Sequence, residues 1–381
     1  MIKPVRKKGT HKILWSVLIV TAIFVACAAA AYLAFVMQTD GEKETPINAS
    51  PVVSTMDFVL DPGISYEHAL TEKNLFFYSA ENIKIIDEKG EIKQDFILPL
   101  SQPVISTRSD YALIYDKGAR KAFLFRSSKQ IKEIELTESI ISASVNSTGS
   151  SVFITKGETH QCSVSVLNSR GEEKFRWNSG GLYVLSADIS DNGEDIAVSA
   201  LNTDGGVLTS HIILFAIDKE QPFANHKYTD EIFAATKFSG NTLYAIGDSA
   251  AYVYNGYGKV TGTIDYAERE LLNYNTDGDA LALVFSGSGL SIGAGDLETY
   301  NTKGEKLGQF HSSQEISFID CIGGRIAVKN GRVVSILNSK CKEEFQISPE
   351  TDLLDFMFFE NELRAVGVSA AGAQLIRVTK N

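Results

Sequence analysis

The sequence predicts an all-β fold, an eight-bladed β-propeller, and three observations support this class. Short runs of strand-forming residues alternate with turn clusters along most of the chain. A turn motif recurs with a mean spacing of about 42 residues, which is typical of propeller blades built from four short strands. One apolar strand stands before the first full repeat, and the last repeat is one strand short.

The N-terminal segments indicate a membrane anchor. Residues 1–12 carry five basic and no acidic side chains, and residues 13–37 contain no charge. At about 1.5 Å per residue, a helix over 13–37 is long enough to cross a hydrocarbon core of about 30 Å. The basic start predicts a cytoplasmic N-terminus, which would place the rest of the chain outside the cell membrane. Residues 38–51 are polar, contain Gly and Pro, and are expected to form a flexible linker.

Two alternatives to an uncleaved anchor remain open at this stage. The small residues Ala28–Ala31 are compatible with a cleaved signal peptide, although the apolar segment is longer than is usual for one. In a lipoprotein signal, Cys27 would be lipidated, but Phe24 stands where such signals usually have Leu.

Residues 52–381 are predicted to form the propeller. A turn that combines Asn or Asp, Gly and a charge follows the third strand of each repeat. Its Gly-equivalent positions are Gly90, Lys129, Gly171, Gln221, Gly258, Gly304 and Cys341. A second series marks the turn between the first and second strands, at Gly149, Gly193, Gly240, Gly278 and Gly324. Hairpin turns need positive φ, which Gly adopts at little cost.

The ends of the body predict how the ring closes. Residues 352–379 supply three strands of an eighth blade, and the strand at 55–60 has no partners of its own. We expect this N-terminal strand to become the outer strand of the last blade. A seven-bladed ring is the alternative, if one repeat in the irregular region 180–230 has been miscounted.

Three repeats carry the pattern of an apolar strand, a turn with Asp or Asn and Gly, and a second apolar strand: 142–155, 186–200 and 273–285. They resemble the repeats of WD-repeat-like and quinoprotein-like propellers, although Trp177, the only Trp of the body, is followed by Asn and not by Asp. With its N-terminal segment, the chain resembles a family of single-pass membrane propellers of unknown function from Gram-positive bacteria. This resemblance implies a fold and a location, and no activity.

Few residues point to chemistry, and we predict no catalytic, cofactor-binding or metal-binding set. The six His residues are scattered, and the acidic turns at 190–195, 203–206 and 275–280 have the composition of tight turns rather than of twelve-residue calcium loops. Three body cysteines are expected to be free and mostly buried: Cys162, Cys321 and Cys341. Trp177 is expected to pack between blades rather than against a quinone.

These observations favour a non-catalytic interaction module over an enzyme. Beyond residue 39 the chain carries 31 basic and 47 acidic side chains, which argues against nucleic acid as a partner. We expect an envelope protein, a peptide or a glycan to bind the loops of one face, with the membrane contacted through 13–37. The alternative is a glycosidase, lyase or cofactor-dependent dehydrogenase with a site in the central channel. It would need converging carboxylates, for which Asp188 and Asp320 are the inward candidates. A sensor is a third possibility, but twelve cytoplasmic residues would oblige it to act through a second protein.

Overall fold

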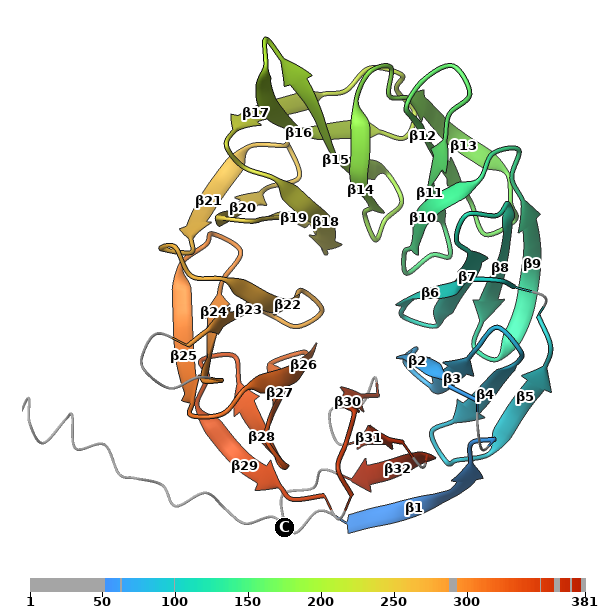
Figure 1. Cartoon of the computed structure of the whole chain (residues 1–381), viewed down its shortest axis with the longest axis vertical. Helices are drawn as coiled ribbons and strands as arrows, with labels where there is room; N and C mark the ends of the chain where they lie inside the picture. The colour runs from blue at the N-terminus through green and yellow to red at the C-terminus, as the bar shows by residue number, and fades with distance from the viewer. Residues whose placement is uncertain are drawn as a thin grey trace, which may run out of the picture. The chain divides into compact units, whose positions relative to one another are not determined.

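The computed structural model describes residues 52–61, 64–98, 100–287, 293–349, 351–359, 364–370 and 372–377. These residues form eight four-stranded antiparallel sheets, and Figure 1 shows them arranged in order around a common axis. The expected basic terminus 1–12, membrane span 13–37 and linker 38–51 lie outside the described residues, as do Cys27 and the signal alternatives. The described part of the chain contains no helix that could span a bilayer.

Each sheet is one blade, and blades are numbered in chain order. The first four blades have these strands: blade 1, β2 (Glu67–Leu70), β3 (Asn74–Tyr78), β4 (Ile83–Asp87) and β5 (Ile92–Phe96); blade 2, β6 (Pro103–Arg108), β7 (Tyr111–Asp116), β8 (Lys121–Arg126) and β9 (Lys129–Glu135); blade 3, β10 (Ile140–Val145), β11 (Ser151–Lys156), β12 (Cys162–Leu167) and β13 (Glu173–Asn178); blade 4, β14 (Tyr183–Ile189), β15 (Asp195–Asp204), β16 (Val207–Ala216) and β17 (Ala224–Thr229).

The other four blades complete the ring. Their strands are: blade 5, β18 (Phe233–Ser239), β19 (Thr242–Gly247), β20 (Ala250–Tyr254) and β21 (Val260–Asp265); blade 6, β22 (Leu271–Asn275), β23 (Leu281–Ser286), β24 (Gly295–Tyr300) and β25 (Lys306–Ser312); blade 7, β26 (Ile316–Ile322), β27 (Arg325–Asn330), β28 (Val333–Asn338) and β29 (Glu343–Ile347); blade 8, β30 (Asp355–Phe358), β31 (Arg364–Ser369), β32 (Gly372–Arg377) and β1 (Val52–Val59).

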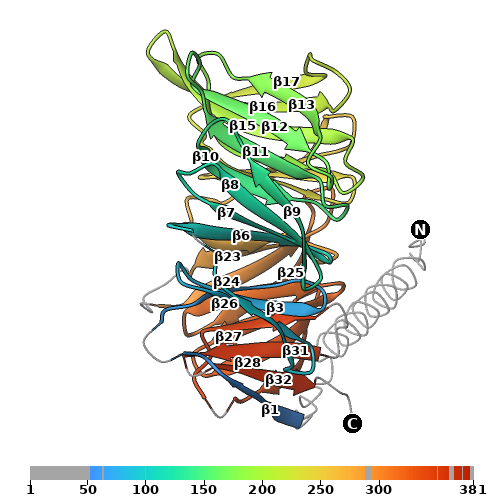
Figure 2. The same ribbon diagram turned by 90° about the vertical axis from the view of Figure 1, so that its right-hand side faces the viewer.

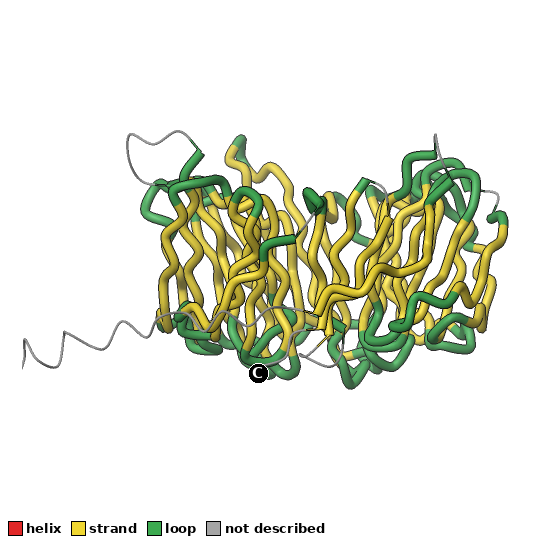
Figure 3. Tube along the Cα trace, turned by 90° about the horizontal axis from the view of Figure 1, so that it is seen from below, coloured by secondary structure: helices red, strands yellow, loops and turns green. Residues whose placement is uncertain are grey.

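The first strand of each blade faces the axis and the fourth lies at the rim (Figure 1). We call them the inner and outer strands. From the side, the strands form one layer with loops at both ends (Figures 2 and 3).

Blade 8 contains both ends of the described chain. Its strand order is β1-β32-β31-β30, and β1 is antiparallel to β32 with Val52 opposite Arg377. The strand expected at 55–60 is therefore part of β1, which begins earlier, at Val52. The prediction of eight blades is confirmed, and the seven-bladed alternative is wrong.

The hydrophobic core is divided among the interfaces between neighbouring blades. Phe76 of blade 1 packs edge-on against Phe125 of blade 2, with ring centroids 6.0 Å apart. Trp177 of blade 3 lies 5.2 Å from Phe215 of blade 4, which confirms its expected role between blades. Each fully buried aromatic side chain contributes roughly 2 kcal/mol through burial, so the ring is stabilised at every blade boundary.

The recurrent turn after the third strand has a clear physical basis. In five blades an Asn or Asp side chain accepts the backbone N–H groups two and four residues further on. The residue three positions after it has positive φ; these residues are Gly90, Gly171, Gly258, Gly304 and Cys341. The degenerate positions Lys129 and Gln221 were predicted wrongly, since neither has positive φ and Ser127 takes that conformation in blade 2.

The second Gly series holds in part. Gly149, Gly193 and Gly240 have positive φ, as expected for the turns after the inner strands. Gly278 and Gly324 do not; in blade 7 the positive φ belongs to Gly323, which forms a bridge with Gly278 of blade 6.

The inner strands of blades 3 to 7 share a β-bulge near their beginning. In each, one exposed residue has no opposite residue on the second strand: Ile141, Leu185, Ala234, Leu272 and Ser317. A bulge bends its strand and turns one side chain out of the regular pattern. The repeat therefore extends to a backbone irregularity that sequence spacing does not reveal.

Candidate functional site

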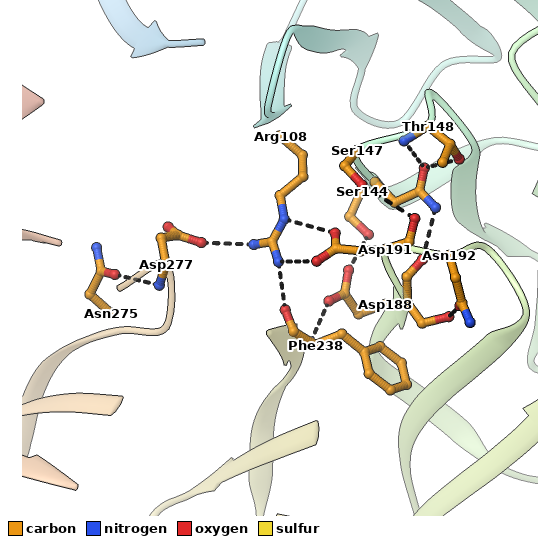
Figure 4. Close-up of polar contacts among 12 residues, drawn as sticks. Arg108, Ser144, Ser147, Thr148, Asp188, Asp191, Asn192, Phe238, Asn275 and Asp277 are labelled. Carbon is orange, nitrogen blue, oxygen red and sulfur yellow. Dashed lines mark hydrogen bonds and ion pairs between the residues drawn. The ribbon is translucent and has the colours of Figure 1, made fainter. Parts of the chain in front are cut away.

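Arg108, the last residue of β6, joins four blades at the end of the inner strands. Its Nε and Nη2 donate to the two carboxylate oxygens of Asp191, each at 3.2 Å, and its Nη1 donates to Asp277 at 2.7 Å. Nη2 also donates to the carbonyl oxygen of Phe238 at 2.9 Å. Figure 4 shows the guanidinium held between the two carboxylates.

These contacts cross the ring. Arg108 belongs to blade 2 and Asp277 follows the inner strand of blade 6, so three blades separate them in either direction. Burial opposes the charge of Arg108, but the hydrogen bond to Asp191 and the negative charge of Asp277 outweigh it and raise the arginine pKa. The guanidinium therefore stays charged and braces the ring at this end.

Two cavities border this brace. The smaller, of about 150 Å³, is lined by blades 2 to 6 and includes Ser106, Asp188, Lys237 and Tyr274. The larger, of about 520 Å³, is lined by every blade except blade 3. Its apolar side chains come mainly from blades 1, 7 and 8: Ala69, Leu70, Ile322, Met357 and Phe358. Arg108 and Asp277 line both cavities.

The two predicted inward acids lie at the cavities and have equivalent partners. Asp188 accepts the backbone N–H of Phe238 at 2.8 Å, and Asp320 accepts that of Phe358 at 2.7 Å. In both cases the donor lies on the inner strand of the next blade. The second oxygen of Asp188 accepts the Ser144 hydroxyl at 3.0 Å. Each carboxyl group therefore connects two neighbouring inner strands.

Burial raises the pKa of both acids. Burial raises the pKa of Asp320 to about 8. The hydrogen bond from the Phe358 N–H lowers this pKa, whereas the negative charges of Asp277 and Asp355 raise it further. For Asp188 burial again dominates, although the Lys237 charge and the Phe238 N–H lower the pKa. Asp320 is half-buried because it borders the larger cavity, whereas Asp188 is buried.

Lys237 and Tyr274 line the smaller cavity from blades 5 and 6. Both are half-buried. Burial raises the pKa of Tyr274, and the positive charge of Lys237 lowers it, so the ammonium group lies within electrostatic range of the phenol. Lys237, Tyr274 and Arg108 were not predicted from the sequence, because none of them belongs to a local motif. The one signal in the sequence was the presence of a basic residue, Arg108 or Lys237, at or near the end of an inner strand.

The other residues weighed in the sequence have local structural roles. Within the described ranges, no group of three or more His, Cys, Asp or Glu side chains could hold a metal ion. The acidic turns at 190–195 and 275–280 instead supply the partners of Arg108. The described His residues contact nearby side chains or backbone, as His311 does with Asp296 at 2.7 Å. His11 lies outside the described residues.

The cysteine prediction is confirmed. Cys162, Cys321 and Cys341 are free and buried. Cys321 lies on the inner strand of blade 7 and Cys341 in the turn after its third strand, so two strands separate them as expected. Burial raises the pKa of both thiols, which keeps them protonated at neutral pH.

Comparison with solved structures defines the class of protein as a WD40-like β-propeller. The C-terminal WD40 domain of Sif2 matches with a TM-score of 0.60 and 12% identity, over 87% of this chain and 99% of that one. The computationally designed Ika8 protein matches with a TM-score of 0.58 and 11% identity, over 82% of this chain and 96% of that one. At these identities the likeness shows the fold alone.

The chain belongs to a family of unknown function, DUF5711, whose model matches residues 51–378. No curated protein matches the sequence. The expected membership of a propeller family without assigned activity is confirmed, whereas the anchor and the bacterial origin stay predictions.

Proposed function

We propose that this chain is a non-catalytic interaction module, tethered to the membrane through residues 13–37, which binds a segment of an envelope partner at the axial end of its inner strands. The larger cavity carries the proposal. Seven of the eight blades contribute to its lining, so a bound segment could contact all blades except blade 3. Its apolar side chains adjoin the paired charges of Arg108, a combination that suits an exposed peptide loop with apolar and polar side chains.

The acids at the site support binding rather than catalysis. General acid–base chemistry needs carboxylates free to exchange protons with a substrate. Asp188 and Asp320 accept N–H groups of the neighbouring blade, and Asp191 and Asp277 are paired with Arg108. These contacts give each acid a structural partner and fit a preorganised binding surface.

The location is part of the same proposal and rests on the sequence. Five basic residues precede an uncharged stretch of 25 residues, a pattern that favours a single-pass anchor with its N-terminus in the cytoplasm. The propeller would then lie on the outer side of the cell membrane, where envelope proteins are accessible.

Site-specific photo-crosslinking in the native cells tests the proposal. A benzophenone amino acid at Ser239, which lines the larger cavity, is expected to give a discrete adduct with one partner. The matched control places it at Gln130, an exposed residue of the outer strand β9. In a second chain, the Ser239 probe is combined with Met357→Glu, which puts a charge into the apolar lining and should abolish the adduct. Equal adducts at both positions, or one that survives Met357→Glu, would refute the site.

A further inference from the structure

The smaller cavity contains a cation without a counter-ion. Lys237 lines it, and within the described part of the chain its ammonium group has no ion-pair or hydrogen-bond partner. The other cation of the cavity, Arg108, donates four of its five N–H groups to Asp191, Asp277 and a carbonyl oxygen. Lys237 is half-buried, and an anion in this cavity would be attracted to its positive charge more strongly than in open water.

The acids near Lys237 do not fill this role. Both oxygens of Asp188 accept hydrogen bonds, from Ser144 and from the Phe238 N–H, and burial disfavours its charged form. Asp277 directs its carboxylate to Arg108. The two carboxylates of the cavity are therefore engaged elsewhere, while the ammonium group of Lys237 remains available as a donor.

Tyr274 supplies a second donor. Tyr274 lines the same cavity, and its hydroxyl group has no hydrogen-bond partner among the described residues. A group bound there would meet one positive charge and one phenolic O–H. A ligand that matches this pair is an acceptor with one negative charge.

We propose that the smaller cavity binds a carboxylate group, which pairs with the ammonium of Lys237 and accepts a hydrogen bond from the hydroxyl of Tyr274. One carboxylate oxygen can serve each donor. Asp277, which lines the cavity too, would repel a dianion such as phosphate more strongly than a single carboxylate. The volume of about 150 Å³ corresponds to about five water molecules at about 30 Å³ each, and thus to a ligand group of about the size of benzene.

This site rests on the proposed function and deepens it by naming the chemistry that the ring recognises. The carboxylate would belong either to a small organic acid or to the C-terminal residue of a bound peptide. Both sources would present the same carboxylate group to Lys237. They are distinguished by comparing the binding of small organic acids with that of peptides with a free or an amidated C-terminus.

Saturation-transfer NMR on the full chain tests the site with acetate, succinate, and triglycine with a free or an amidated C-terminus. At least one carboxylate should bind with a Kd of about 1 mM or tighter. Lys237→Met removes the charge while keeping an unbranched side chain, and should weaken binding about tenfold or more. Tyr274→Phe should weaken it about threefold. The control Lys259→Met removes an exposed cation from the same blade and should leave binding unchanged.

The outcomes separate the sources and the two proposals. Binding of acetate or succinate without triglycine indicates a free organic acid; tighter binding of free than of amidated triglycine indicates a peptide terminus. No carboxylate binding, or equal binding in wild type and Lys237→Met, overturns the site. Because the probes are not the envelope partner, this result is independent of the photo-crosslink at Ser239, which tests the proposed function separately.

Discussion

The contribution of Asp320 to stability should fall as pH rises, because the folded chain holds a proton on Asp320 that the unfolded chain releases. Its pKa is raised to about 8 in the folded state from an ordinary value of 3.8, mainly by burial. Between about pH 4 and about pH 8 the folded state holds one proton more than the unfolded state. The contribution of Asp320 to the free energy of unfolding is therefore fully present below about pH 4 and decreases progressively up to about pH 8. The free energy of unfolding decreases by about 1.4 kcal/mol per pH unit through this one group, which amounts to a loss on the order of 5 kcal/mol over the whole range. Solvent in the larger cavity screens the half-buried carboxylate, which would make its pKa in the folded state lower than about 8. The pH range over which stability is lost would then end at a lower pH.

Asp320→Asn isolates this contribution. Asn cannot ionise, but its carbonyl oxygen can still accept the N–H of Phe358. Urea unfolding at pH 5 to 9 should show the variant gaining on wild type by about 1.4 kcal/mol for each pH unit until the wild-type curve levels off. Asp188 titrates in both proteins and cancels in the difference. The control Asp230→Asn removes an exposed carboxylate and should follow the wild-type profile. Parallel profiles for wild type and Asp320→Asn would refute the raised pKa and the reasoning from burial.

The remaining predictions concern the brace, the blade contacts and the thiols. A double-mutant cycle of Arg108→Met and Asp277→Asn, read by urea unfolding, should give a coupling energy of about 0.2 to 1 kcal/mol, because Asp277 is exposed. Zero coupling would show that the brace does not act across the ring. Gly308→Ala should cost about 2 kcal/mol of stability, because its methyl group would overlap a backbone carbonyl of the next blade. Gly324→Ala should cost less than about 0.5 kcal/mol, because its methyl group would meet only Asp279 Oδ2, at an ordinary contact distance of 3.7 Å. Equal costs would contradict the close contact at Gly308. In a Cys27→Ser chain the three buried thiols should react with a disulfide reagent only as the protein unfolds, and fast reaction of the native protein would contradict their burial.

The sequence was sufficient to predict the ring because its signals are local and repeated. Each blade needs a turn after its third strand. The Asn or Asp that accepts the turn's hydrogen bonds and the residue with positive φ lie within five consecutive positions, so the motif can be recognised in the sequence. The prediction failed at Lys129 and Gln221, where the turn has lost its Gly and spacing alone determined the assignment. The backbone at Cys341 keeps the conformation without Gly, which shows that the surrounding blade can impose positive φ on an ordinary residue.

The site was far less accessible from the sequence, because its contacts join residues that are distant in the chain. Arg108 lies 83 positions from Asp191 and 169 from Asp277. No local pattern records that a residue of blade 2 faces the turn of blade 6; this follows only once eight sheets are placed in a ring. The acidic turns were recognised as turns, and their second role as partners of one arginine depends on the closed fold.

Asp188 and Asp320 show why an inward acid in a propeller is weak support for catalysis. They stand in blades 4 and 7, and each accepts a backbone N–H from the inner strand of the following blade. A catalytic pair would be expected to differ in role, with one acid free to give a proton and the other free to accept one. Here both acids make the same contact at equivalent positions, and each contact joins the inner strand of one blade to the inner strand of the next. A repeated contact of this kind is explained by the assembly of the ring. In the proposed interaction module, recognition would fall to groups without such a contact, of which Lys237 is the clearest.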